Sequence, residues 1–208
     1  MVGDMPLERF RRMIRNLRPD DFVFSVIGGN QYAAIATLKY SVDFDFLDSP
    51  AARDPGAEQV QIIPARALQS YLGEGIRSND GAMLRLIRQE TRARVFHLAP
   101  PPPKEDNEFI AANLESNFVD ESSEIPTIAR PTLRLKCWRT QQEILTKLCA
   151  EAQIGLIMPP NEAVTPAGYL RPEFYGRDST HANRRYGELV LKQIMALVES
   201  SDQKEHRL

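Results

Sequence analysis

The sequence has few of the features that mark secreted or membrane proteins. Cysteine occurs only twice, as Cys137 and Cys149. Both lie in one expected helix, and the helical rise between them exceeds the reach of a disulfide. No run of about 18 apolar residues is present, and residues 1–10 contain no apolar core of a signal peptide. These absences predict a soluble protein of the cytoplasm.

An excess of charge of either sign is also missing. The chain has 26 basic and 28 acidic residues and a net charge of -2, so no overall field attracts it to nucleic acid or to an acidic membrane. Neither is an expected partner. A chain of 208 residues buries about 70% of its unfolded surface on folding. We expect one domain over residues 1–208, with a polar tail at 201–208.

The stretch that organises the chain is the apolar run 22–27, which stops at Gly28, Gly29 and Asn30. A run without polar alternation predicts a strand buried on both faces of a parallel sheet. Ligands of such sheets bind outside the carboxyl ends of the strands, where glycines permit close approach and a carboxamide can donate hydrogen bonds. Asn30 is therefore a candidate binding residue, and a simple strand-to-helix turn is the alternative.

Two further strands are expected, at 93–98 and 154–158, and each stops at a proline-containing loop. Alternation of strands with helices predicts an α/β protein of three layers, α/β/α, around a mostly parallel, doubly wound sheet. Three strands are fewer than the about five or six of an average sheet. Either a strand is hidden in an irregular stretch such as 58–63, or the first strands lie outside this chain.

The expected helices show amphipathic spacing, and the remaining segments carry turn or acidic residues. The stretch 41–59 is expected to be irregular, and the acidic stretch 119–126 to be an exposed loop. The helix that begins at Pro131 is expected to be the longest, with Trp138 in the core. The expected helices cover 7–17, 32–38, 64–76, a segment from 80, a segment from 131, and 186–198.

The loop before the last helix carries Asp178 and His181, three positions apart. An aspartate placed in this way can accept the Nδ1 proton of the histidine, fix its tautomer and stabilise the imidazolium. His181 would then be an oriented general base. His97, near the end of the second strand, is open to two interpretations, as a buried structural histidine or as part of a ligand crevice.

These residues resemble the SGNH or GDSL hydrolases. Residues 28–31, GGNQ, are similar to the family's third block, G-x-N-D, with Gln31 in place of the aspartate. Residues 178–181, DSTH, precede the last helix and are similar to the fifth block, D-x-x-H. The resemblance covers about residues 20–198, but only these two short blocks carry it.

The resemblance implies a flavodoxin-like fold and an acyl-transfer mechanism. In that mechanism His181 is the base, Asp178 orients it, and Asn30 donates a hydrogen bond to the oxyanion. The implied substrate is a small-molecule or carbohydrate ester. We expect no cofactor and no metal, and the sequence does not predict an oligomeric state.

The nucleophile of this mechanism is missing from the sequence. The family's first block, G-D-S, and the glycine of its second block should precede the strand at 22–27, where this chain has mostly one helix. Residues 3–5, GDM, carry methionine in place of the serine and follow no strand. Ser25 lies inside a strand and Ser179 lies within the D-x-x-H block, so neither is a persuasive nucleophile.

Three explanations are open at this point. In the one we favour, the chain is part of an ester hydrolase whose serine lies on residues outside it. In the second, the chain is a non-catalytic relative that binds an acylated or glycosylated molecule, or a structural partner domain. In the third, the resemblance is accidental and the Asn30 loop binds phosphate, although GGN matches neither common glycine pattern of nucleotide loops. The first two predict that Asp178 bonds His181, and that Asn30 and His181 share a crevice.

Overall fold

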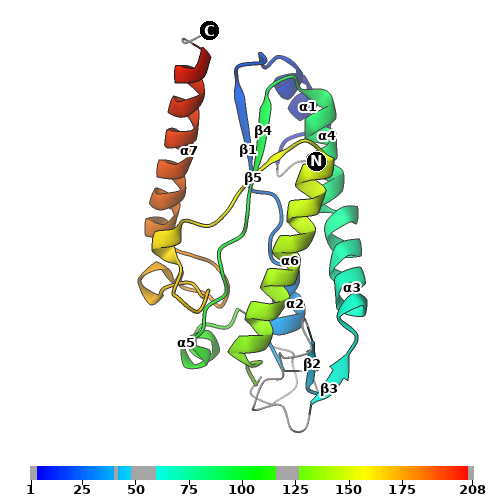
Figure 1. Ribbon diagram of the computed structural model, residues 1–208, viewed down its shortest axis with the longest axis vertical. Helices are drawn as coiled ribbons and strands as arrows, with labels where there is room; N and C mark the ends of the chain where they lie inside the picture. The colour runs from blue at the N-terminus through cyan, green and yellow to red at the C-terminus, as the bar shows by residue number, and fades with distance from the viewer. Residues whose placement is uncertain (1–3, 40–41, 48–59, 116–126, 206–208) are drawn as a thin grey trace.

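The computed structural model describes residues 4–39, 42–47, 60–115 and 127–205. Figure 1 shows an α/β protein in which helices pack against parallel strands. The main sheet has three parallel strands in the order β1-β4-β5, and β4 is central. The expected parallel α/β arrangement is confirmed. The strands span Phe22–Ser25 (β1), Arg94–Leu98 (β4) and Gly155–Ile157 (β5).

β1 forms one edge of this sheet. In its register with β4, Ser25 lies opposite His97. No strand pairs with the other side of β1 in the part of the chain that the structure describes. The ring centroids of Phe22 and Phe24 are 6.0 Å apart, and that of Phe24 lies 5.6 Å from Phe96 of β4. A ladder of stacked aromatic rings therefore covers one face of β1 and β4.

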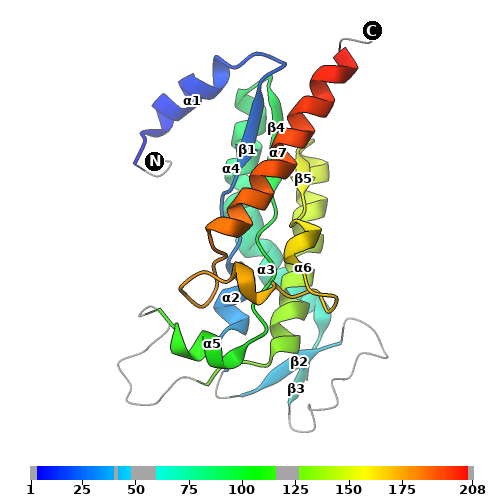
Figure 2. The same cartoon turned by 90° about the vertical axis from the view of Figure 1, so that its left-hand side faces the viewer.

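Helices lie on both sides of the main sheet (Figures 1 and 2). On one side α6 packs against β5, α2 and α3, and this side holds the main hydrophobic core. On the other side α7 crosses the strands, and its first turns contact a second, small cluster around Leu170 and Phe174. The helices span Leu7–Arg15 (α1), Gln31–Ala36 (α2), Ala65–Ser78 (α3), Asp80–Glu90 (α4), Asn107–Ala112 (α5), Pro131–Glu151 (α6) and Arg184–Glu205 (α7).

The helix boundaries follow local chemistry. α6 begins at Pro131, whose fixed φ suits the first helical position and whose missing N–H has no partner there in any case. α7 begins after Asn183, whose side-chain oxygen accepts a hydrogen bond from the backbone N–H of Tyr186 at 3.2 Å. Both cysteines lie buried and unbonded in α6. No helix in the described ranges is both long and apolar enough to cross a membrane.

The stretch 41–59 is not wholly irregular, so that prediction was wrong in part. Phe44–Phe46 forms β2, which pairs in parallel with β3 (Gln61–Ile63) in a separate two-stranded sheet. The acidic Asp45 obscured this strand in the sequence. Its carboxylate is buried because Lys136 Nζ and Arg130 Nη1 pair with it at 2.6 and 3.3 Å. A strand does occur within 58–63, as anticipated, but it does not extend the main sheet.

Two expectations about the last helix are corrected. α7 has 22 residues and α6 has 21, so the last helix is the longest within the described ranges. α7 also continues to Glu205, into the segment expected to be a polar tail, because its glutamine, lysine and glutamate residues are good helix formers. The acidic stretch 119–126 and Gly3 lie outside the described residues.

Candidate functional site

Asp178 and His181 form the hydrogen-bonded pair that their spacing predicts. His181 Nδ1 lies 3.0 Å from Oδ2 of Asp178. The other carboxylate oxygen, Oδ1, accepts the backbone N–H groups of Thr180 at 3.0 Å and of His181 at 2.6 Å. Because both oxygens have partners, the carboxylate is held in one orientation towards the ring. The expected contact is confirmed.

The same hydrogen bonds act on the charge of Asp178. Partial burial by itself raises the pKa of this carboxyl, but the N–H groups of His181 and Thr180, followed by the His181 ring, outweigh it and hold the pKa below its usual value. Asp178 is therefore ionised at neutral pH. It can fix the histidine tautomer and stabilise an imidazolium. The His181 side chain itself is 63% exposed and open to a ligand.

The turn after β1 places two glycines at positive φ, with φ of 73° at Gly28 and 113° at Gly29. A Cβ at Gly28 would lie 1.9 Å from Oδ2 of Asp80, and one at Gly29 would lie 3.0 Å from Pro100. Both positions combine a left-handed backbone with close packing, so they require glycine. The turn places the exposed Asn30 at the start of α2, near the carboxyl end of β1.

A buried glutamine of α6, which was not predicted from the sequence, supports this turn through two hydrogen bonds. Gln141 donates from Nε2 to the Gly29 carbonyl at 2.9 Å and accepts from the Tyr32 N–H at 2.8 Å. The side chain is fully buried. Gln141 lies three residues after Trp138 and four before Leu145, so its helical position on the core face was a signal that could have revealed it.

The departure of Gln31 from the family pattern has a local explanation. The Gln31 side-chain amide donates a hydrogen bond to the carboxylate of Asp80, the first residue of α4. Burial raises the pKa of Asp80, while the hydrogen bonds from Gln31 and the Gly29 backbone counteract it in part. An aspartate at position 31 would face this buried carboxylate with a second negative charge.

Asn30 and His181 line one crevice, as predicted. The crevice has a volume of about 770 Å³ and lies between α7 and the carboxyl ends of β1 and β4. At the side of His181 it is polar, with Arg184 and Glu188 on the first turns of α7. Further along α7 it is apolar. The apolar walls include Phe24, Val26, Leu98, Val190, Leu191 and Ile194.

Ser25 and Ser179, which the sequence analysis rejected as nucleophiles, do not line the crevice. Both are buried, and the Ser179 hydroxyl donates to Glu115. Thr180 is a lining residue of the crevice, but its hydroxyl lies 3.4 Å from His181 Nδ1, the nitrogen that is already bonded to Asp178. Nε2 of His181, acting as a base, therefore could not take the proton of this hydroxyl. The described lining residues include no serine or cysteine.

His97 is a structural residue and not part of the crevice. It is 1% exposed in the central strand β4, and burial lowers its pKa. Of the two interpretations left open by the sequence, the structure supports the buried histidine.

The described residues contain one cluster whose ligand atoms are close enough for a metal ion, namely Glu115, Asp178 and His181. The potential ligand atoms already make hydrogen bonds to one another and to the backbone of the loop. Glu115 accepts from the N–H and hydroxyl of Ser179, and both Asp178 oxygens have partners. The Lys104 ammonium also bonds this loop at Gly176. A second cation would compete with those contacts, so we assign the cluster to loop structure.

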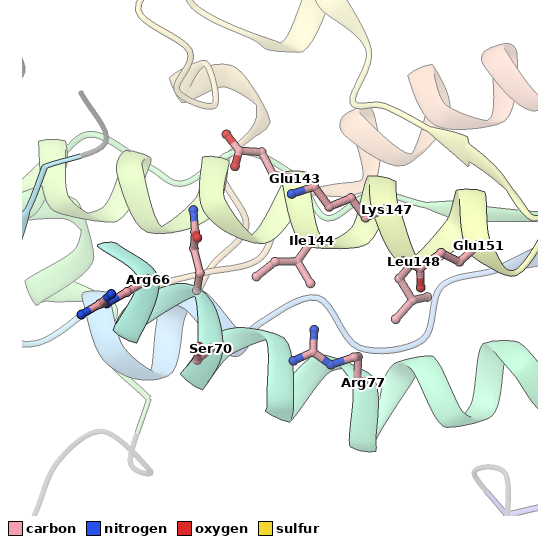
Figure 3. A pocket seen from close by; sticks show the side chains of 9 residues that line it. Arg66, Ser70, Arg77, Glu143, Ile144, Lys147, Leu148 and Glu151 are labelled. Carbon is pink, nitrogen blue, oxygen red and sulfur yellow. The ribbon is translucent and has the colours of Figure 1, made fainter. Parts of the chain in front are cut away.

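Other hollows of the described residues lie away from this site, one of them beside α1. A polar hollow of about 300 Å³ between α3 and α6 mixes Arg66, Arg77 and Lys147 with Glu143 and Glu151 (Figure 3). Because basic and acidic side chains both line it, the hollow favours neither an anionic nor a cationic ligand. An apolar hollow of about 390 Å³ is lined by residues of β2, β3 and α3. Neither hollow contains a histidine or a cysteine among its described lining residues.

No protein-family model matches this chain, and no curated protein is significantly similar to it. The geometry of the crevice is therefore the basis on which a function can be assigned.

Proposed function

We propose that this chain provides the acid-base part of an acyl-transfer site of the SGNH-hydrolase type. The observation that supports this most directly is that Asn30 and an Asp178-bonded His181 open on one crevice at the carboxyl ends of parallel strands. The finer fold assignment, a flavodoxin-like three-layer sheet, belongs to the same proposal. The substrate is the ester of a small molecule or carbohydrate, and the nucleophile comes from residues outside the chain.

The roles follow from the atoms that remain free. Since Nδ1 of His181 is bonded to Asp178, Nε2 is the nitrogen that takes the proton of an attacking hydroxyl. The ionised Asp178 then stabilises the imidazolium. The Asn30 side chain makes no hydrogen bond to another described residue, so its amide N–H is available to a developing oxyanion. One such donor lowers the barrier by about 3 to 4 kcal/mol.

The crevice walls favour the acylated ligand over the glycosylated one. Ile194 lies ten positions after Arg184 in α7, a rise of about 15 Å, and the lining changes from polar to apolar along this path. An amphipathic molecule with its polar end at His181 and a hydrocarbon chain along α7 matches this gradient. This supports the second candidate function, a non-catalytic binder of acylated molecules, as well as the first.

The isolated chain is expected to hydrolyse p-nitrophenyl acetate hardly at all. Without a nucleophile, no acyl-enzyme can form. Triad-deleted hydrolases retain only about 10³- to 10⁴-fold acceleration over water, from binding and oxyanion stabilisation. The measurement is turnover of the ester by the chain and by His181→Ala, with labelling by a fluorophosphonate probe. Stoichiometric labelling of one serine, with turnover lost in His181→Ala, would show that the chain carries its own nucleophile.

Decanoate is expected to bind the chain, and Leu191→Asp to weaken this binding by about tenfold or more, because burying a leucine side chain contributes about 1.5 to 3 kcal/mol. Leu191 lines the crevice and is 58% exposed, so the change need not disturb the core. Met195, 60% exposed on the same helix but outside the crevice lining, gives the matched control Met195→Asp. Isothermal titration calorimetry with decanoate and acetate measures both effects. Equal weakening by the two variants would contradict an acyl site here.

A further inference from the structure

A buried lysine lies directly behind the loop that carries Asp178 and His181. Lys104 follows four prolines after β4 and is 1% exposed. Its ammonium donates to the backbone carbonyl of Gly176 at 3.1 Å and to that of Asp178. These contacts are with the main chain of the loop, on either side of Arg177. Lysine is almost never fully buried without such partners, so the position needs an explanation.

The surroundings fix the ammonium in place. Lys104 Nζ lies 4.6 Å from the centroid of the Phe109 ring and 5.1 Å from that of Tyr175. Both contacts are cation-π interactions, which are stronger where the cation is desolvated. The Tyr175 hydroxyl in turn accepts the backbone N–H of Glu105 at 3.1 Å. The lysine is therefore enclosed by one ring from α5 and one from the segment that leads into the loop.

The backbone of Lys104 is anchored from the opposite direction by a buried arginine of α6. Arg134 donates from Nε and Nη2 to the Lys104 carbonyl, both at 3.3 Å. It also bonds the Glu105 carbonyl at 3.2 Å and Asn107 Oδ1 at 2.6 Å. Two buried cations in series thus connect the long helix of the core to the loop before α7. Such a connection transmits rigidity only while every hydrogen bond is made.

We propose that Lys104 is a positioning residue of the Asp178-His181 pair, which it holds in register through the Gly176 and Asp178 carbonyls. This inference rests on the proposed function in so far as the pair is catalytic. Lys104 does not touch the crevice and has no role in the chemistry itself. It sets where the Asp178 carboxylate lies, and through it the orientation of the His181 ring.

The arrangement predicts a pH dependence of the loop. Burial lowers the pKa of Lys104 to about 8, against the opposing attraction of Asp178 and Glu115. The other charged or titratable groups that face it are Arg134, at its carbonyl, and Tyr175. Below about pH 8 the charged ammonium holds both carbonyls strongly. Above it a neutral amine donates more weakly, so the loop is expected to loosen.

Global stability should move in the opposite sense. A lysine whose pKa is lowered on folding binds more protons in the unfolded chain between the folded and unfolded pKa values. The contribution of Lys104 to stability therefore rises as pH increases from about 8 towards about 10.5. A purely structural role would show only this change. A positioning role also shows a change at His181.

The test follows the His181 ring resonances by NMR of histidine-labelled protein from about pH 6.5 to about pH 10, assigned with His181→Ala. In the unmodified chain we expect a separate inflection near pH 8. Lys104→Met should abolish it and displace the His181 resonances at neutral pH. Lys104→Arg, which stays charged, should abolish the inflection but keep the neutral-pH positions. Lys136→Met is the matched control, since the Lys136 ammonium also lies over an aromatic ring, 5.0 Å from the Phe46 centroid, but pairs with Asp45 and not with the loop.

An inflection that persists in Lys104→Met, or His181 resonances that Lys104→Met leaves unmoved, would overturn the proposal. If Lys104→Met does not fold by circular dichroism, the unmodified chain decides, since a flat His181 response between about pH 7.5 and about pH 9 contradicts positioning. The readout needs no turnover. A positive result together with no decanoate binding would retain the positioning role and reject the acyl-transfer function.

Discussion

Gly28→Ala is expected to lower the free energy of unfolding by about 3 to 5 kcal/mol. Two effects add at this position. The backbone has φ of 73°, a conformation that costs a residue with a Cβ about 1 to 2 kcal/mol. The new methyl group would also lie 1.9 Å from Asp80 Oδ2, in a carboxylate that is itself held by Gln31. Asp80 could move away only by giving up that hydrogen bond.

Urea unfolding followed by the fluorescence of Trp138 measures this change, because the chain has a single tryptophan and it is buried. Gly75→Ala in α3 is the control. Nothing lies within 4 Å of its added Cβ, and alanine in a helix interior is favoured over glycine by about 1 kcal/mol. The control should therefore be stabilised. A Gly28→Ala variant as stable as the unmodified chain would show that the turn does not have this conformation.

Gln141→Leu is expected to destabilise the protein by about 2 to 4 kcal/mol. The substitution removes the hydrogen-bond partner of two backbone groups in the turn, and each buried group left without a partner costs about 1 to 3 kcal/mol. The groups left without a partner are the Gly29 carbonyl and the Tyr32 N–H. Leucine fills a similar volume, so the loss would report hydrogen bonding more than packing. Decanoate affinity should fall as well, because the turn that presents Asn30 loses its support.

The neighbouring glutamine gives the comparison. Gln142 is also buried in α6, but neither side-chain amide atom has a hydrogen-bond partner among the described residues. Gln142→Leu removes two unsatisfied polar atoms and is expected to be neutral or stabilising. Both variants can be followed in the same urea titrations. If the two substitutions have equal effects, the Gln141 hydrogen bonds do not stabilise the turn.

The features that could be predicted from the sequence are those that depend on nearby residues. The three strands of the main sheet are short segments rich in apolar residues and are followed by glycine or proline loops, and the Asp178-His181 contact closes over three positions. Their placement at one sheet edge then follows from parallel topology alone. Asn30 and His181 share a crevice for this reason, although about 150 residues separate them in the chain.

The supports of the site could not be predicted, because each is a polar residue whose partner is distant in sequence. Lys104 follows a run of prolines and Arg134 lies in a helix, positions where charged side chains are ordinarily exposed. β2 was missed for a related reason, since Asp45 is tolerated in a buried strand only through cations of α6 and the residue before it. Such pairings appear only once the fold brings the partners together.

The outer edge of β1 is a place where a second polypeptide carrying a nucleophile could bind. The Arg94 N–H donates to the Asp21 carbonyl at 2.9 Å, so the alternation of a parallel ladder directs the main-chain groups of Phe22 and Phe24 away from β4. An extended segment from another polypeptide could pair there. If it ran parallel to β1, the residue after its last ladder bond would emerge beside the Gly28 turn. Strand addition at this edge would thus bring a residue of the added segment close to the Gly28 turn, which lines the same crevice as His181.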